Sequence, residues 1–282
     1  MFSALSESAA LDATAASAGL RAYPGYLDRD RQSALLAAIE EVLVAAPLLT
    51  PRMPKSGRPF TVRMSNCGPL GWTSDESGYR YQEVHPVTGR PWPAIPAPLT
   101  AIWDAVAFCP HAPECCLINF YGATAKMSLH QDRDEQDFTA PVVSVSLGDS
   151  CLFRIGGRKR SGPTRALRLN SGDVLVLGGD ARLAFHGVDR IYAGTSTLLR
   201  EGGRINLTML AQESVHLRLR FQADRGGAEK APPSAFGRPR QPLRPCRSSR
   251  SPVQDWHDSA LLVRPSAAAR GELYAAEPPA AR

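Results

Sequence analysis

The sequence predicts a mainly β domain, a sandwich or barrel, with flanking helices. From Cys116 onward, short apolar or alternating runs are separated by Gly, Pro, Asn and Asp, which is typical of strands joined by turns. Upstream of Cys116, apolar residues recur at helical spacing in two stretches. The 282 residues, 43% of them hydrophobic and 21% charged, suffice for one good-sized core. We therefore expect one main folded domain.

The part of the chain before Cys116 is expected to supply the helices. Asp28 or Asp30 is a candidate N-cap for a helix that continues to Val44. Gly, Pro and aromatic residues are dense between residues 51 and 98, which indicates ordered loops and short strands. Residues 99–108 then predict a second short helix.

Strands are expected from Cys116 onward. Each run is short and bounded by turn-forming residues. The expected strands are CLINFY (116–121), VVSVSL (142–147), CLFRI (151–155), ALRLN (166–170), DVLVL (173–177) and RINLTML (204–210), with RLAFHG (182–187) as a further strand that ends at His186.

The two ends of the chain give little folding signal. Residues 1–20 are rich in Ala and Ser, and we interpret them as a flexible leader. Beyond residue 221 the apolar pattern disappears among Pro, Arg, Ser and Ala, so residues 222–282 are expected to be a disordered or spurious tail. Between them we place an N-terminal region at 21–110 and the β domain at 111–221.

Charge and cysteine content limit the possible environments. The net charge is +6, but residues 222–282 hold ten Lys or Arg against six Asp or Glu and so contribute +4 of it. The remainder is only mildly basic. No secretory signal and no bilayer-spanning stretch is visible, and the six cysteines form no C-x-x-C pair. Free thiols and a cytoplasmic location are expected.

Three residues have the chemistry of a metal site. His130 and Asp132 lie two apart between two expected strands, so in an extended segment both project to one face. His186 follows 56 residues later beside Gly187. Two imidazoles and one carboxylate form the facial triad that leaves positions open on iron(II). An H-x-D pattern alone is common, and a lone His is more often a surface or core residue.

A second pair of residues strengthens the metal hypothesis. Arg204 and Asn206 alternate with apolar residues in the strand 204–210, and therefore share one face. An arginine buried in such a strand would bind a dicarboxylate through two parallel hydrogen bonds.

These residues lie within a longer resemblance, from Arg63 to Thr208, to the AlkB-type iron(II)/2-oxoglutarate dealkylases. Several motifs occur in the family's order, which is more specific than the triad alone. They are MSNCGPLGW (64–72), GYRY (78–81), RPWPAIP (90–96), CLINFYGATAKMSLHQDRDE (116–135), PVVSVSLG (141–148), FRIGGRKR (153–160), SGDVLVLGGDARLAFHG (171–187) and GRINLT (203–208).

The resemblance implies a double-stranded β-helix (jelly roll) with an N-terminal nucleotide-recognition lid over the metal. It implies Fe(II), 2-oxoglutarate as co-substrate, and O2. It assigns His130, Asp132 and His186 to iron as the catalytic residues. For 2-oxoglutarate it implies Arg204, which would pair with the distal carboxylate, together with Asn119, Tyr121 and Asn206.

For the substrate, the resemblance implies oxidative removal of small alkyl groups from bases in DNA or RNA. A base must leave its stack to reach a buried metal, and aromatic residues offset part of that cost. Two competing interpretations are that Trp72 fills the core and that the charged candidates named below are solvated loop residues. The residues expected to bind substrate are Trp72, Tyr79, Arg80, Tyr81, Asp134 and Arg160, with Arg158 and Lys159 as further candidates for phosphate contacts.

The sequence departs from the family pattern at Leu210. The family has a second Arg there, two residues after Thr208, which supports the 2-oxoglutarate pocket. A buried Leu cannot replace a cation that faces a carboxylate, so affinity for 2-oxoglutarate or turnover is in doubt. The composition changes soon after Leu210, so a shifted reading frame is a further hypothesis. Comparison of the encoding nucleotide sequence in all three frames tests it.

Two other functions stay open at this point. One is the same oxygenase chemistry acting on a small molecule or a protein side chain. The other is a nucleic-acid-binding module in which the missing Arg has abolished catalysis. We expect alkylated DNA or RNA as the partner, no membrane, and a monomer.

Overall fold

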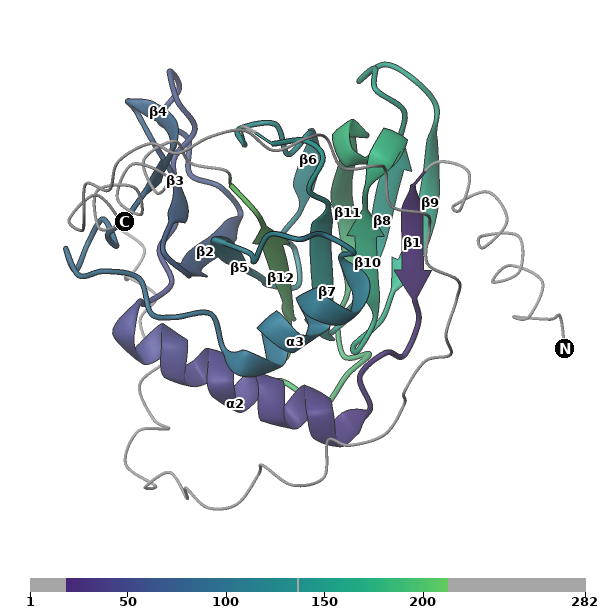
Figure 1. The fold of residues 1–282 in the computed structure, drawn as a ribbon, viewed down its shortest axis with the longest axis horizontal. Coiled ribbons are helices and arrows are strands. Elements are labelled where there is room, and N and C mark those ends of the chain that lie inside the picture. The colour runs from purple at the N-terminus through teal and green to yellow at the C-terminus, as the bar shows by residue number, and fades with distance from the viewer. Residues whose placement is uncertain (1–18, 136, 213–282) are drawn as a thin grey trace, which may run out of the picture. The chain divides into compact units, whose positions relative to one another are not determined.

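The computed structural model describes residues 19–135 and 137–212 (Figure 1). The expected leader, apart from its last two residues, and the expected tail at 222–282 lie outside the described residues. None of the helices in the described part has the length and apolarity needed to cross a bilayer.

Two antiparallel sheets form the body of the domain, and the predicted mainly β fold with flanking helices is confirmed. The six-stranded sheet has the order β1 (Leu20–Tyr23), β10 (Val174–Leu177), β7 (Val142–Gly148), β12 (Arg204–Leu210), β5 (Cys115–Tyr121) and β2 (Val62–Cys67). The four-stranded sheet has the order β6 (Met127–His130), β11 (His186–Tyr192), β8 (Ser150–Gly156) and β9 (Thr164–Leu169).

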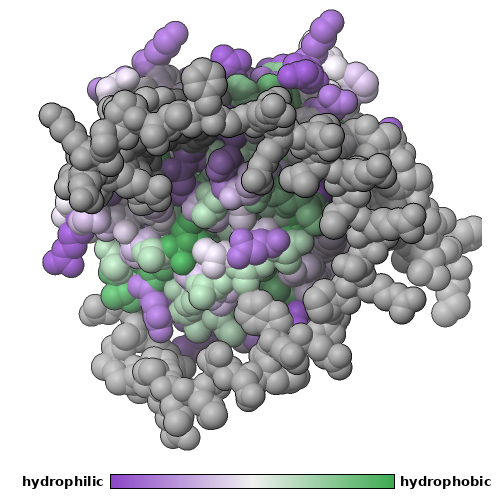
Figure 2. Space-filling view, viewed as in Figure 1, coloured by the Kyte–Doolittle hydropathy of each residue, from purple (hydrophilic) through white to green (hydrophobic). Residues whose placement is uncertain are grey.

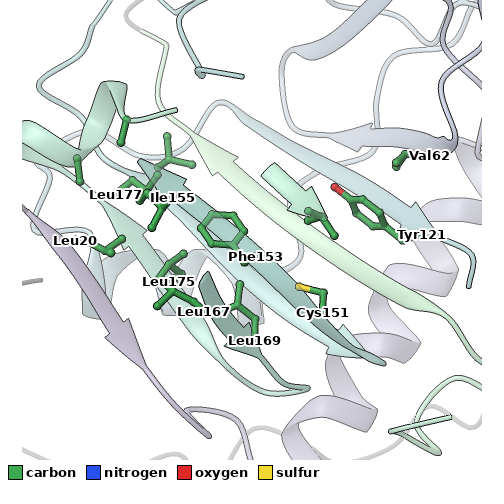
Figure 3. Packing of buried hydrophobic residues seen from close by; sticks show 14 of the residues in the cluster. Leu20, Val62, Tyr121, Cys151, Phe153, Ile155, Leu167, Leu169, Leu175 and Leu177 are labelled. Carbon is green, nitrogen blue, oxygen red and sulfur yellow. The ribbon is translucent and has the colours of Figure 1, made fainter. Parts of the chain in front are cut away.

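The main hydrophobic core lies between the two sheets (Figure 3). Leu175 and Leu177 project into it from β10 of the larger sheet, while Phe153 and Leu167 come from β8 and β9 of the smaller one. Each of these side chains is at most 7% exposed. Burial of a large apolar side chain contributes roughly 1.5–3 kcal/mol, so this layer fixes the two sheets face to face.

Helices α2 (Arg29–Ala45) and α3 (Ala97–Val106) lie together on one side of the larger sheet (Figure 1). The predicted N-cap is confirmed, because the Asp28 side chain accepts a hydrogen bond of 2.9 Å from the Arg31 backbone N–H. The second helix was predicted at 99–108 but begins and ends two residues earlier. Charged and apolar side chains mix over the face of the molecule that carries these helices (Figure 2).

Strand β12 has two chemically different faces. Ile205, Leu207 and Met209 are buried, and they alternate with Arg204, Asn206, Thr208 and Leu210 on the other face. Because β12 lies between β5 and β7, its backbone is hydrogen-bonded on both edges. A central strand with one apolar face against a core can therefore present polar side chains rigidly on the other.

The sequence did not assign β1, β6 or β11, and the short strands expected between residues 51 and 98 were not assigned individually. Leu20, placed at the end of the leader, begins β1, which pairs with β10 at the edge of the larger sheet. The loop-rich region contains a hairpin of β3 (Gly71–Asp75) and β4 (Gly78–Gln82), which we call the aromatic hairpin because it carries Trp72, Tyr79 and Tyr81.

Five of the six cysteines lie in the described residues, and all five are free thiols, as predicted. Cys67, Cys115, Cys116 and Cys151 are buried, whereas Cys109 is partly exposed. Burial raises the pKa of Cys115 and of Cys151. These thiols therefore stay protonated at neutral pH.

Candidate metal and co-substrate site

A cavity of about 460 Å³ opens among residues of both sheets and the aromatic hairpin. Its wall includes His130, Asp132 and His186, and also Arg204 and Leu210. The expected metal residues and the expected co-substrate residues therefore face one cavity. This size lies within the usual range of small-molecule sites.

The three predicted metal ligands converge in this cavity. His130 ends β6, His186 begins β11, and the two residues are register partners across the antiparallel pair. Asp132 follows β6 and places its carboxylate Oδ2 3.4 Å from His186 Nε2 and its Oδ1 3.6 Å from His130 Nε2. One ligand atom from each residue lies within 4.8 Å of the others, so the three can hold one ion.

Gly187 permits this close approach of β6 and β11. A Cβ atom at Gly187 would lie 2.5 Å from the Met127 carbonyl oxygen of the paired strand. The prediction that His186 ends a strand was wrong, because residues 179–183 form a 3-10 helix and His186 instead begins β11. Alternation of apolar residues in RLAFHG resembles a strand, but the carbonyl of Ala181 closes a turn by accepting from Ala184 N–H.

Hydrogen bonds set the orientation of both imidazoles. His130 Nδ1 lies 2.9 Å from the Ser128 carbonyl oxygen, and His186 Nδ1 lies 2.9 Å from the Ala184 carbonyl oxygen. A carbonyl only accepts, so each Nδ1 carries the proton, and each Nε2 is directed toward Asp132. This is the usual arrangement in which the second ring nitrogen orients a metal-binding histidine.

The electrostatics of the triad favour a cation. Burial by itself raises the pKa of Asp132, but the neighbouring His186 and His130 outweigh it and hold this pKa well below its usual range. Burial and the charge of His186 lower the pKa of His130. Burial opposes a charge on His186, yet the Asp132 carboxylate raises its pKa. A bound cation therefore meets an ionised carboxylate, and it competes with a proton for Nε2 of His186.

The opposite wall of the cavity holds unsatisfied polar groups. Arg204 is 1% exposed, and it donates to Ser146 Oγ at 2.8 Å through one terminal nitrogen. Its Nε has no partner, and neither does Asn119 Oδ1. Buried polar groups are nearly always paired, so these two atoms indicate a site for a polar ligand. The Asn119 amide presents either a donor or an acceptor after a half-turn about its terminal bond.

The remaining expected co-substrate residues surround Arg204. Tyr121 is the register partner of Arg204 across β5 and β12, and Asn206 is the partner of Asn119. All four line the cavity. The prediction that Leu210 shares this face is also confirmed, and Leu210 is 2% exposed. Two arginines are among the described residues that line the cavity. Arg133 is exposed, whereas Arg204 is buried.

The aromatic hairpin closes one side of the cavity. Trp72 and Tyr79 stack with ring centroids 5.5 Å apart and an angle of 20° between their planes. Trp72 Nε1 donates to Asp134 Oδ2 at 2.9 Å, which joins the hairpin to the loop that carries Asp132. All three residues line the cavity, and Tyr79 is 52% exposed.

Two of the expected substrate residues lie away from the cavity lining. Arg80 points along the aromatic hairpin and forms two hydrogen bonds with Asp75, at 2.6 and 2.9 Å. Arg160 is exposed in the turn between β8 and β9, although it is near enough for its charge to lower the pKa of His130, after burial and the charge of His186. Tyr81 does line the cavity, and its hydroxyl donates to Glu135.

Sequence reasoning missed the buried pair of Glu135 and Arg182. Arg182 Nη2 lies 3.0 Å from Glu135 Oε2, and both side chains are 2% exposed. The acidic cluster around Asp134 gave a partial signal for Glu135. Arg182 had no signal, because it was interpreted as one residue of a strand.

The chain belongs to the 2OG-Fe(II) oxygenase superfamily, whose profile matches residues 19–209. Within it the chain is an AlkB-type enzyme. It is 52% identical over 191 residues to the alpha-ketoglutarate-dependent dioxygenase AlkB homolog of Caulobacter vibrioides, covering 68% of this chain and 86% of the relative. Identity to AlkB of Escherichia coli is 42%, covering 62% of this chain and 82% of that protein. The predicted AlkB-type resemblance is confirmed.

A solved structure supports the same assignment. OsALKBH1 matches with a TM-score of 0.58 and 31% identity, covering 68% of this chain and 98% of that one. The double-stranded β-helix expected from the sequence is thereby confirmed. Membership in the family implies Fe(II), 2-oxoglutarate and O2. The donor set of the triad and the two unpaired polar atoms near Arg204 fit an iron ion and a dicarboxylate respectively.

Removal of the metal is expected to stop turnover and to be reversible. A chelator such as EDTA should reduce succinate production from 2-oxoglutarate to background, because the triad then holds no ion to bind the co-substrate and oxygen. Addition of Fe(II) in excess of the chelator should restore it. Succinate that persists after dialysis against the chelator would contradict a metal requirement.

Proposed function

We propose that this chain is an iron(II)- and 2-oxoglutarate-dependent dioxygenase that oxidatively demethylates N-alkylated nucleobases in DNA, with RNA as a second candidate polymer. Succinate, CO2 and an aldehyde are the other products. The observation that carries the proposal is the stacked pair of Trp72 and Tyr79, which stands on the wall of the cavity that contains the triad. An aromatic platform beside a buried metal suits a base that has left its stack.

Each group of residues has a distinct role. His130, Asp132 and His186 hold the iron, and Arg204 binds the distal carboxylate of 2-oxoglutarate with help from Asn119, Tyr121 and Asn206. Iron with 2-oxoglutarate and O2 supplies the oxidising power that hydroxylates the alkyl carbon on the base nitrogen. The product, which carries nitrogen and hydroxyl on one carbon, then releases an aldehyde. The apolar residues of the lining, which include Phe153 and Leu177, limit the access of water to the reacting atoms.

Recognition of the base is assigned to the aromatic hairpin and Asp134. Stacking on an aromatic ring contributes roughly 1–3 kcal/mol per base. The Asp134 carboxylate now accepts a hydrogen bond from Trp72 Nε1, and it can accept one from an amino group of the base instead. This suits a base that presents a hydrogen-bond donor. Arg80 and Arg160 lie outside the lining and are assigned to phosphates rather than to the base.

The distribution of charge favours a polyanion beside the cavity. Residues 19–212 contain 21 Lys or Arg and 18 Asp or Glu, a net charge of +3. The hairpin of β8 and β9, residues 150–169, holds six of those cations and no acid. The rest of the described part is therefore net negative, at −3. A cationic hairpin that includes Arg160 suits the phosphate backbone, since cations that replace its counterions gain affinity.

Replacement of Trp72 by alanine tests the substrate assignment. Repair of a methylated oligonucleotide is expected to fall about tenfold, in line with the loss of one stacking platform. The slow decarboxylation of 2-oxoglutarate without substrate should stay within twofold of wild type, because the Trp72 side chain hydrogen-bonds to Asp134 and not to a triad residue. Aldehyde and succinate are measured in parallel.

Trp72→Phe is the matched control, since it keeps a stacking ring and loses only the N–H bonded to Asp134. It should retain most of the repair activity. If Trp72→Ala reduces both activities together, or neither, then Trp72 is a packing residue and the substrate assignment fails. Activity on a free small molecule but not on oligonucleotides would favour the alternative small-molecule oxygenase.

One specific observation favours a second function. Leu210 leaves the co-substrate pocket with a single buried cation, as a nucleic-acid-binding homologue with impaired catalysis would have. Wild-type chain that binds methylated oligonucleotide and yields no succinate at any concentration of 2-oxoglutarate would support that function. We also propose a monomer located in the cytoplasm, with alkylated nucleic acid as its partner.

A further inference from the structure

The pair of Glu135, which lines the cavity, and Arg182, which does not, adjoins the Asp132 backbone and has no role in the binding of iron, co-substrate or base proposed above. Arg182 belongs to the 3-10 segment at Gly179–Leu183, which leads into His186. Its side chain is 2% exposed and makes three hydrogen bonds. Burial of a guanidinium is costly unless its N–H groups are paired, so such a residue indicates a specific requirement at this place.

The three bonds of Arg182 all end on the loop after β6. Nη1 donates to the Asp132 carbonyl at 2.6 Å, Nε donates to the Ala140 carbonyl at 2.8 Å, and Nη2 contacts Glu135 at 3.0 Å. Gln131 adds a fourth link, because its amide donates to the Leu183 carbonyl at 2.6 Å. The loop that carries Asp132 is thus tied to the segment that carries His186.

Both carboxylate oxygens of Glu135 have a hydrogen-bond partner. One carboxylate oxygen faces Arg182, and the other accepts from the hydroxyl of Tyr81 in the aromatic hairpin. Burial, followed by the charge of Glu135, raises the pKa of Tyr81, so the phenol stays protonated and remains a donor. The aromatic hairpin is therefore tied to the same pair.

We propose that Arg182 is a positioning residue of the metal site. Its planar guanidinium holds the backbone of Asp132 at a fixed distance from the 3-10 segment that precedes β11. It thereby sets the separation of two metal ligands, Asp132 and His186. A lysine cannot do this, because its single nitrogen cannot reach three acceptors in fixed directions. The inference rests on the metal assignment under the proposed function, but it does not depend on the substrate.

Titration of the full-length, metal-free protein with Mn(II) in a calorimeter tests the proposal without any turnover. Arg182→Lys is expected to weaken Mn(II) binding ten- to a hundredfold, as is usual when a residue that orients metal ligands is lost. Arg154→Lys is the matched control. Arg154 also pairs with a carboxylate, Asp189 at 3.0 Å, but on the exposed side of the smaller sheet. This control should bind Mn(II) within twofold of wild type.

A second variant covers the case in which Arg182→Lys does not fold. Arg182→Met combined with Glu135→Leu replaces the buried pair by apolar side chains, a change that is often neutral or stabilising. It removes the bond to Asp132 while keeping the volume filled, and its Mn(II) affinity should fall by the same factor. Thermal unfolding followed by circular dichroism identifies which variant is folded.

Three outcomes are decisive. Wild-type Mn(II) affinity in a folded Arg182 variant overturns the positioning role, and failure of both variants to fold does so as well, because Arg182 would then serve the fold. If wild type binds no Mn(II), or Asp132→Ala binds it equally well, the metal assignment itself is wrong. That result is distinguishable, because it appears without any change at Arg182.

Discussion

Replacement of Asp132 by alanine is expected to abolish iron-dependent succinate production. Asp132 lies 3.4 and 3.6 Å from the two histidine Nε2 atoms and supplies the only carboxylate among the three converging groups. Its loss removes the negative charge that the two neutral imidazoles cannot replace, and leaves two protein ligands instead of three. His130→Ala should have the same effect. Production of succinate is measured with Fe(II) and 2-oxoglutarate in excess.

Asp137→Ala is the control for this experiment. Asp137 is in the same loop, but it bonds to Thr139 outside the cavity lining. Its replacement should leave succinate production unchanged and the fold intact. Retention of more than about a tenth of wild-type activity in Asp132→Ala or His130→Ala would falsify the triad.

Leu210→Arg is expected to lower the concentration of 2-oxoglutarate that gives half-maximal succinate production. Leu210 is buried on the same face of β12 as Arg204, so a guanidinium there reaches into the co-substrate pocket. A charge-assisted hydrogen bond contributes about 1.5–3 kcal/mol, which corresponds to roughly ten- to a hundredfold in binding. The bound carboxylate would offset the desolvation of the new cation.

Leu210→Met separates charge from side-chain length. It fills a similar volume without a cation, and should leave the half-saturating concentration of 2-oxoglutarate within about twofold of wild type. Equal half-saturation in Leu210→Arg and wild type would mean that Leu210 does not face the bound co-substrate. Another cation, such as Arg218 outside the described residues, would then be the candidate for that role.

The sequence was sufficient to predict the fold class and the residues that converge, because strand alternation determines which side chains share a face. Asn119 with Tyr121, and Arg204 with Asn206, follow this rule. It failed at RLAFHG, where a 3-10 turn gives a similar spacing of apolar residues. The buried pair of Glu135 and Arg182 was not predictable, since its partners are 47 residues apart and a charged side chain is usually assigned to the surface.

Strand β1 was missed for a different reason. Four residues are too few to show a periodicity, and Leu20–Tyr23 becomes a strand only because the edge of β10 accepts it. Arg80 and Arg160 illustrate the converse problem. Their type suggests phosphate contacts, but sequence alone does not reveal that Arg80 already pairs with Asp75.

The burial of the cysteines has a consequence for an enzyme that handles oxygen. A thiolate, not a thiol, is the form that oxidants attack. Cys115 and Cys151 each stand two residues before a residue that lines the cavity, Leu117 and Phe153 respectively, yet their raised pKa keeps the sulfur protonated. The protein thereby carries sulfur near the cavity with protection against oxidative self-damage. In the described part, the partly exposed Cys109 is left as the cysteine that oxidants reach first.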